Sequence, residues 1–401
     1  MSFLAERLER IQPSPTLALN ARAAALKREG IDIINLALGE PDFDTPIWVQ
    51  KAAVQSMEQG MTKYTPVEGI PALRKAIQQK FLRDNKLDYD LDQVIVSTGG
   101  KQVIFNALMA TINKGDEVLI PAPYWVSYPD MVNLFGGVSC PIACSEDNNF
   151  KLTPDQLQAA ITPKTKWLIL NSPSNPTGSL YTATELRALA DVLMDNSHVH
   201  VISDDIYENL VYDYHKFINL VQIEPRLKLR TLIVNGVSKS YAMTGWRIGY
   251  GVGSKELIKA MIMVQSQSTS NTCSIAQGAA VMALNGPQGF LEDWRRIFSE
   301  RRDVTFQALN KIDGLICRKA EGAFYLYVNC QAVLGKTTPG GQVLETDNQF
   351  SEYLLESARV MVVSGDAFGL SPYFRISYAT SVENLKEACE RIQAAMADLK
   401  S

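Results

Sequence analysis

Residues 231–247 read TLIVNGVSKSYAMTGWR, a short apolar run followed by a loop of small and polar residues. The run Thr231–Asn235 predicts a buried β-strand, and Lys239 comes just beyond its end. Desolvation at such a position lowers the pKa of a lysine and frees its amine to attack a carbonyl. Arg247 follows eight residues later and offers a planar donor fork that suits a phosphate. A nucleophilic amine and a phosphate-binding arginine together suit a phosphorylated aldehyde cofactor. The alternative is that Lys239 is a solvated surface group, as a lone lysine in a loop usually is.

Apolar runs of the same kind recur through the middle of the chain and predict further strands at Val94–Val96, Glu117–Pro121, Val138–Ile142, Lys166–Asn171, Val199–Ser203 and Trp246–Val252. Patterns of helical period lie between several of them, at Gln102–Thr111, Tyr124–Leu134 and Thr182–Met194. Strands that alternate with helices indicate βαβ units. We therefore expect an α/β fold whose large domain, residues 46–286, has three layers (α/β/α) and a mostly parallel sheet.

The pattern changes from about Pro287 onward. A charged helical pattern runs to Leu309, and a closing helix is predicted at Val382–Leu399. Strand patterns lie between them at Phe324–Val328, Val360–Val363 and Phe374–Ser377. We expect residues 1–45 and 287–401 to form together a smaller α+β domain.

Composition narrows the class of protein. The chain of 401 residues is 46% hydrophobic and 20% charged, which is typical of a soluble globular protein. Its formal net charge of -4 offers no basic surface for nucleic acid. The six cysteines contain no C-x-x-C pair and favour a reducing compartment, and no metal site is expected. No secretory signal or membrane-spanning run is visible, so a cytoplasmic protein without a membrane partner is predicted.

Two polar clusters follow predicted strands. The stretch SPSNPTG, residues 172–178, forms a rigid turn in which the Asn175 amide can donate to an oxygen. Asp204 follows an apolar run, where a buried carboxylate needs a cation such as a pyridinium nitrogen. The alternatives are a structural turn for the first cluster and a capping role for Asp204. Asp205 is interpreted as structural.

A third cluster, STGGKQ at residues 97–102, closes one strand and opens a helix. Glycines at Gly99 and Gly100 let backbone N–H groups approach an anion, and the helix N-terminus favours negative charge. A pair of glycines alone is weak evidence, but here it lies between a strand and a helix.

Together these clusters resemble one family, the fold-type-I pyridoxal-phosphate aminotransferases of class I/II. Residues 238–250, SKSYAMTGWRIGY, match the motif S-K-x-x-A-M-T-G-W-R-I-G-Y of the bacterial-type aspartate aminotransferases. The resemblance covers nearly the whole chain, through PSPT (13–16), LGEPDFDTP (38–46), KYTP (63–66), PYWVSYP (123–129) and FRISYA (374–379). It implies an enzyme that moves the α-amino group of an amino acid to a 2-oxo acid through a pyridoxamine form of its cofactor.

The resemblance implies roles around the cofactor ring of pyridoxal 5'-phosphate. Lys239 would bind the cofactor covalently and later move a proton between substrate and cofactor. Asp204 would pair with the protonated pyridine nitrogen, while Tyr207 and Asn175 would hydrogen-bond the phenolic oxygen. Trp125 would stack on the ring face, with plain core packing as the alternative.

The phosphate would be held by small and basic residues, namely Gly99, Gly100, Lys101 and Arg247. Tyr64 would reach the phosphate of a neighbouring subunit, which implies a homodimer with shared active sites. Many relatives carry a serine three residues before the lysine, where this chain has Gly236. Ser238 is a candidate to replace it, and a structural role for Ser238 is equally open.

For the substrate, the resemblance implies a fork from Arg375 to the α-carboxylate and a lid segment that carries Gly39. Other substrate contacts would come from Lys101, Trp125, Asn175 and Thr16. Because Lys101 would add a second cation, aspartate or glutamate is the expected donor. An aromatic, prephenate or alanine specificity stays open, as do a lyase on the same fold and a regulatory protein built on an inactive domain.

Overall fold

The computed structural model describes the backbone of residues 3–11 and 15–400 and the side chains of residues 3–11 and 21–400. Its large sheet runs in the order β2-β8-β7-β6-β5-β3-β4. The strands are β2 (Val94–Ser97), β3 (Glu117–Ala122), β4 (Val138–Ala143), β5 (Thr165–Asn171), β6 (His200–Asp204), β7 (Thr231–Gly236) and β8 (Gly249–Val252). Neighbouring strands pair in parallel except at β8, which is antiparallel to both β2 and β7. The predicted α/β class and the mostly parallel sheet are confirmed.

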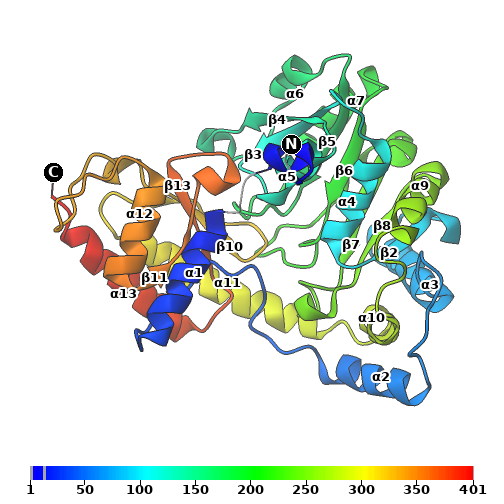
Figure 1. Ribbon diagram of the computed structural model, residues 1–401, viewed down its shortest axis with the longest axis horizontal. Coiled ribbons are helices and arrows are strands. Elements are labelled where there is room, and N and C mark those ends of the chain that lie inside the picture. Colours follow the sequence, from blue (N-terminus) through cyan, green and yellow to red (C-terminus); the bar gives the residue numbers. More distant parts are fainter. Residues whose placement is uncertain (1–2, 12–14, 401) are drawn as a thin grey trace.

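Helices cover both faces of this sheet (Figure 1). One layer contains α4 (Gly100–Thr111), α5 (Ser127–Leu134) and α9 (Lys255–Ser266). The other contains α2 (Ile47–Glu58), α3 (Pro71–Lys80), α6 (Pro154–Ala160), α7 (Ala183–Asp195), α8 (Leu220–Ile223) and α10 (Ser274–Asn285). In β5, Trp167 and Ile169 pack toward the first layer, and Leu168 and Leu170 pack toward the second. The middle of the strand therefore carries apolar side chains on both sides, as a sheet buried on both faces requires.

A second sheet, in the order β12-β13-β10-β9, lies in the other half of the molecule (Figure 1). Its strands are β9 (Ile316–Cys317), β10 (Tyr325–Asn329), β12 (Val363–Ser364) and β13 (Tyr373–Ser377). The helices around it are α1 (Pro15–Arg28), α11 (Phe290–Leu309), α12 (Asp347–Tyr353) and α13 (Val382–Ala397). Phe298 of α11 and Ile392 of α13 share one apolar core with Phe324 and Phe374.

The two ends of the chain meet in a short parallel pair, in which β1 (Ile34–Asn35) lies beside β11 (Val360–Met361). We propose on this basis that residues 1–45 and 287–401 form one smaller domain next to a large domain of residues 46–286. The prediction of one strand over Val360–Val363 was wrong. Because its first half pairs with β1 and its second half with β13, two strands of different sheets form there.

Strand order decides where the polar clusters meet. The strands β2, β5, β6 and β7 run in the same direction, so their carboxyl ends lie along one edge of the sheet. In open α/β sheets ligands bind at this edge. The prediction for β8 was too long, because Thr244–Trp246 forms a 3-10 turn before the strand begins at Gly249. Within residues 3–11 and 15–400, every helix is too short or too polar to cross a bilayer.

Candidate active site

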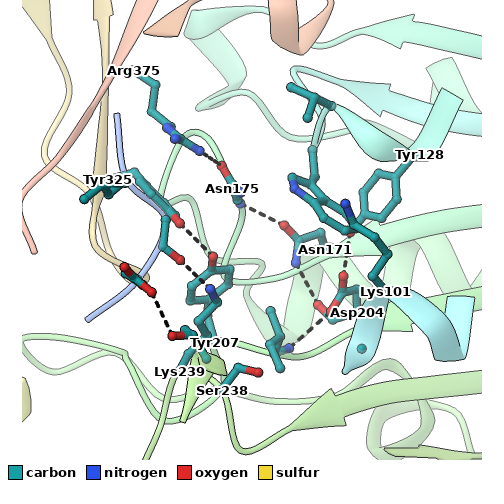
Figure 2. Close-up of a pocket in the computed structure, with 18 of the residues that line it drawn as sticks. Lys101, Tyr128, Asn171, Asn175, Asp204, Tyr207, Ser238, Lys239, Tyr325 and Arg375 are labelled. Atoms are coloured by element: carbon teal, nitrogen blue, oxygen red, sulfur yellow. Dashed lines mark hydrogen bonds between the residues drawn. The ribbon is translucent and has the colours of Figure 1, made fainter. Parts of the chain in front are cut away.

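A cavity of about 500 Å³ opens at this edge of the sheet (Figure 2). Its size is in the usual range for a pocket that binds a small molecule. Most of the predicted site residues line it: Gly39, Gly100, Lys101, Trp125, Asn175, Asp204, Tyr207, Ser238, Lys239, Arg247 and Arg375. They come from segments that are far apart in the sequence. Gly39 and Arg375, for example, line the same cavity although more than 300 residues separate them.

Two further predicted residues, Gly99 and Tyr64, are not part of the cavity wall. Gly99 lies directly behind Arg247, since a Cβ at this glycine would overlap the guanidinium group. Tyr64 is 92% exposed and lies outside the cavity. Thr16 belongs to α1, and its side chain lies outside the described residues. Contact of Tyr64 or Thr16 with a bound molecule stays a prediction.

Lys239 lies just beyond β7, and its Nζ points into the cavity, where it donates a hydrogen bond to the carbonyl oxygen of Gly39 (Figure 2). Burial lowers the pKa of Lys239 to about 8, and the negative charge of Glu40 opposes part of this effect. At neutral pH a larger fraction of this amine is therefore unprotonated than in an exposed lysine. An amine of this kind is suited to attack on a carbonyl.

Asp204 ends β6, and its carboxylate is buried against the floor of the cavity. The hydroxyl of Tyr128 donates to its Oδ2 over 2.7 Å, and the backbone N–H of Ile206 donates to its Oδ1 over 3.4 Å. Burial raises the pKa of Asp204 to about 6, although the bond from Tyr128 lowers it. A carboxylate in this position gains from a cationic partner in the cavity.

A chain of amides links Asp204 to the far wall of the cavity (Figure 2). Asn171 donates to the Asp204 carbonyl over 2.8 Å, and its own oxygen accepts from the backbone N–H of Asn175 over 2.8 Å. The Asn175 side-chain oxygen then accepts from Nη1 of Arg375 over 2.8 Å. These bonds connect the large sheet with β13 and fix the orientation of both amides.

Arg375 is a buried cation on β13. Its Nη2 donates to the Ala37 carbonyl over 2.6 Å, while its buried Nε has no hydrogen-bond partner among the described atoms. The guanidinium lies between the rings of Tyr325 and Phe368, with centroid distances of 4.4 and 4.9 Å. Burial lowers the pKa of Arg375, but a guanidinium stays charged in proteins. A buried charge with an unsatisfied donor favours binding of an anion such as a carboxylate.

One end of the cavity is formed by the first turn of α4 and by Arg247. A Cβ on Gly249 would overlap the backbone of Gly99 and Gly100, so only glycine lets β8 approach this turn. Backbone N–H groups at the start of a long helix attract phosphate. Gly236 does not line the cavity, and a Cβ there would lie 3.0 Å from the Ile248 carbonyl oxygen, so a serine would be crowded.

Lys101 extends over the face of Trp125, with its Nζ 4.7 Å from a ring centroid. Burial and the charge of Arg247 lower the pKa of Lys101. Trp125 also meets Tyr128 edge to face, with ring centroids 5.3 Å apart. The indole is thus a flat part of the cavity wall, and Lys101 places a cation over its face.

Sequence reasoning missed several residues of the site, namely Glu40, Tyr128, Asn171, Thr244, Tyr325 and Phe368. For Tyr128 a signal existed, because it lies three residues after Trp125 in the stretch PYWVSYP, although the predicted helix Tyr124–Leu134 begins only at Ser127. Asn171 ends a predicted strand beside the later cluster around Asn175. The hydroxyl of Tyr325 lies 2.9 Å from that of Tyr207, a contact across 118 residues that no local pattern encodes.

A family model described as aminotransferase class I and II matches residues 31–392. The chain therefore belongs to the class I and II aminotransferases, and it is an enzyme that transfers amino groups. The family and activity expected from the sequence are confirmed.

Relatives of this family are similar over their whole length. The probable aspartate/prephenate aminotransferase of Rhizobium leguminosarum bv. phaseoli is 58% identical over 393 residues, 98% of each chain. The aspartate/prephenate aminotransferase of Cereibacter sphaeroides is 56% identical over 399 residues, and the match covers 100% of both chains.

Solved structures show the same arrangement. The crystal structure of the aspartate aminotransferase from Rhizobium meliloti has a TM-score of 0.97 at 55% identity, over all of both chains. The Thermus thermophilus aspartate aminotransferase with maleate has a TM-score of 0.92 at 41% identity, over 98% of this chain and 100% of that one.

Proposed function

We propose that this aminotransferase uses pyridoxal 5'-phosphate on Lys239 to move the α-amino group of aspartate or glutamate to a 2-oxo acid. The observation that carries the proposal is the position of Lys239, whose amine shares one cavity with a buried carboxylate and a buried guanidinium. Its pKa of about 8 leaves a larger fraction of this amine unprotonated at neutral pH than in an exposed lysine.

The residues fit the cofactor part by part. Asp204 is a buried acceptor that would pair with the protonated ring nitrogen, and Trp125 offers a flat face for the ring. Arg247 and the N-terminus of α4 would hold the phosphate. When bound, this cofactor supplies a reactive aldehyde and an electron-withdrawing ring.

The protein's own groups supply the acid–base chemistry and the orientation. Lys239 would release the cofactor to the incoming amine and then take the proton from the α-carbon of the substrate. Tyr207 would stay protonated, because burial raises its pKa well above its usual range, and its hydroxyl would serve as a donor beside Tyr325. Asn175 would assist as a second donor on the same side of the cavity.

Substrate recognition rests on two cations at opposite sides of the cavity. Arg375 would bind the α-carboxylate, and its unpaired Nε supports this role. Lys101 would bind the distal carboxylate of aspartate or glutamate. Aspartate and prephenate, which appear in the names of the relatives, both carry two carboxylates. An aromatic or alanine-type preference is the alternative.

Gly39 and Glu40 lie on a segment fastened to the loop that carries Lys239. The Thr244 hydroxyl donates to the Glu40 carboxylate over 2.8 Å, and the Thr45 hydroxyl donates to the Ala242 carbonyl over 2.7 Å. We infer that this segment covers the bound substrate and excludes water from the reaction.

A homodimer is part of the proposal. Tyr64 is almost fully exposed, and the nearby helix α2 also exposes Ile47, Val54 and Met57. Apolar side chains gathered on one surface indicate contact with another protein, and a second copy is the occupant that the family resemblance implies. Tyr64 of one subunit would then approach the phosphate end of the cavity in the other. Sedimentation equilibrium of the purified protein tests the assembly.

The function is tested with a panel of amino donors and 2-oxoglutarate, in which formation of glutamate is read directly. Aspartate should give the highest kcat/KM, and oxaloacetate should form in equal amount. An aromatic or alanine optimum would replace the proposed specificity. Borohydride reduction of the holoenzyme should fix the cofactor on the peptide that contains Lys239, and a label elsewhere would remove the central assignment.

A further inference from the structure

The turn after β6 has two faces with different environments. Asp204 and Tyr207 point into the cavity (Figure 2). Asp205 and Glu208, which alternate with them, are buried and lie outside the cavity, with exposed fractions of 2% and 7%. The contacts that hold Asp205 and Glu208 therefore also fix the direction in which Asp204 and Tyr207 point.

Glu208 is held by a closed set of polar contacts. Its carboxylate forms an ion pair with Nζ of Lys80, and Lys80 also donates to the side-chain oxygen of Asn85 over 2.8 Å. The Asn85 amide then donates to Glu208 over 3.2 Å. Each of the three side chains is more than nine-tenths buried, so solvent screens their charges little.

A local irregularity of the chain builds this contact. The helix α3 ends at Lys80 and continues into a π-helical turn over Phe81–Asn85, which Lys86 ends at φ 57°. In a π-helix the hydrogen bonds span five residues, which brings Asn85 back toward Lys80. Such turns are rare and often accompany functional sites.

Asp205 secures the other half of the turn. Its carboxylate accepts from the Ser203 hydroxyl over 2.7 Å and from the side-chain amide of Asn219. Its backbone N–H donates to the Val234 carbonyl of β7 over 2.9 Å. The turn is thus tied to the neighbouring strand and to α8, while Lys80 ties it to α3.

We propose that Lys80 and Glu208 are positioning residues, which hold the turn of residues 204–208 so that Asp204 and Tyr207 face the cofactor. This inference rests on the proposed function. A buried ion pair contributes little net stability compared with apolar residues of similar size, so stability alone is a weak explanation for it. A displaced turn would misplace both the ring-nitrogen partner and the phenol donor, and small misplacements at a reacting centre are costly.

The test compares holoenzymes of the wild type, Lys80→Met, Glu208→Gln and the double variant Lys80→Met/Glu208→Leu. The double variant removes both charges and should recover much of the stability that Lys80→Met loses. The matched control is Arg302→Met, because Arg302 is equally buried and is paired with Asp213 and Asp303 outside the cavity.

We expect Lys80→Met, Glu208→Gln and the double variant to lower kcat by about tenfold or more, with a smaller change in KM. The pH at which the absorbance of the bound cofactor changes should shift in the same three proteins. Arg302→Met should lose stability and keep kcat. If the double variant regains wild-type kcat and absorbance together with stability, the pair is only structural and the proposal is overturned.

A second measurement is independent of catalysis. In the cofactor-free protein, amide hydrogen exchange of residues 204–210 should be faster in Glu208→Gln than in the wild type and unchanged in Arg302→Met. Equal exchange in all three proteins would overturn the inference. Failure of the wild type to transaminate would instead overturn the proposed function, and the exchange result would still report whether the pair holds the turn.

Discussion

The Tyr128 hydroxyl donates a 2.7 Å hydrogen bond to the buried carboxylate of Asp204, from the first turn of α5 to the end of β6. The same tyrosine ring packs edge to face against Trp125. One side chain therefore orients the Asp204 carboxylate and also supports the indole of Trp125, and both residues line the cavity. Its hydroxyl also stabilises the charged form of Asp204, which burial disfavours.

Tyr128→Phe removes the hydrogen bond and keeps the ring. The pKa of Asp204 should rise further. Loss of a hydrogen bond to a charged group costs about 1.5–3 kcal/mol, so kcat/KM should fall about tenfold or more. Steady-state kinetics with aspartate checks this. Tyr181→Phe is a suitable control, because Tyr181 is also buried and hydrogen-bonded, to Leu152, but lies outside the cavity. Equal kinetics for both variants would contradict the role of Tyr128.

Asp204 should make the stability of the cofactor-free protein depend on pH. Its pKa is about 6 in the folded chain, against an ordinary value of 3.8, so between these two pH values the folded state holds a proton that the unfolded state has lost. Stability from this group is present below about pH 4 and is lost as the pH rises through about 6. Asp204→Asn cannot ionise and should be more stable than the wild type at pH 7 by up to roughly 3 kcal/mol. Urea unfolding at pH 4 and pH 7 measures the difference, which should vanish at the lower pH.

The rate of cofactor attachment should follow the protonation of Lys239. Only the unprotonated amine attacks an aldehyde, so attachment of pyridoxal phosphate should speed up as the pH rises through about 8. Stopped-flow absorbance on the cofactor-free protein records this step. Lys239→Ala should show no covalent phase and no turnover. The rate should level off above this pH, and a rate that still rises as steeply at pH 9 as at pH 7 would contradict the lowered pKa.

Lys101→Ala tests the second cation. It should weaken recognition of the distal carboxylate by roughly 2–5 kcal/mol and thus raise KM for aspartate far more than KM for alanine. Alanine serves as the control within the same variant, because it lacks that carboxylate. Equal increases for the two amino acids would assign Lys101 to the phosphate or to the fold.

Gly249→Ala tests the close approach of β8 to the turn of Gly99 and Gly100. The added Cβ would overlap that backbone, which should destabilise the protein by about 1–3 kcal/mol and weaken cofactor binding. Gly253→Ala is the matched control on the same segment, since its Cβ would meet ordinary contacts of 3.5 Å or more. Urea unfolding and cofactor titration should separate the two variants, and equal behaviour would mean that the turn can move freely.

Local sequence patterns located the strands of the large sheet and some of the residues that line its cavity. β-Branched runs identify buried strands, and polar residues directly after them identify the edge where a ligand binds. Lys239, Asp204 and Gly100 each follow such a run and line the same cavity. The order of the strands in the sheet was not available from these patterns, because pairing depends on contacts between distant segments.

Only the tertiary structure decided the contacts that connect these residues. The bond from Arg375 to Asn175 and the pairing of Lys80 with Glu208 join segments more than 100 residues apart. The split of Val360–Val363 between two sheets has the same origin, since each half takes a different partner strand. Periodicity reports which face of an element is apolar, whereas the identity of its neighbour depends on how the whole chain packs. The amino acids thus determined which chemistry is present, and packing determined which groups meet.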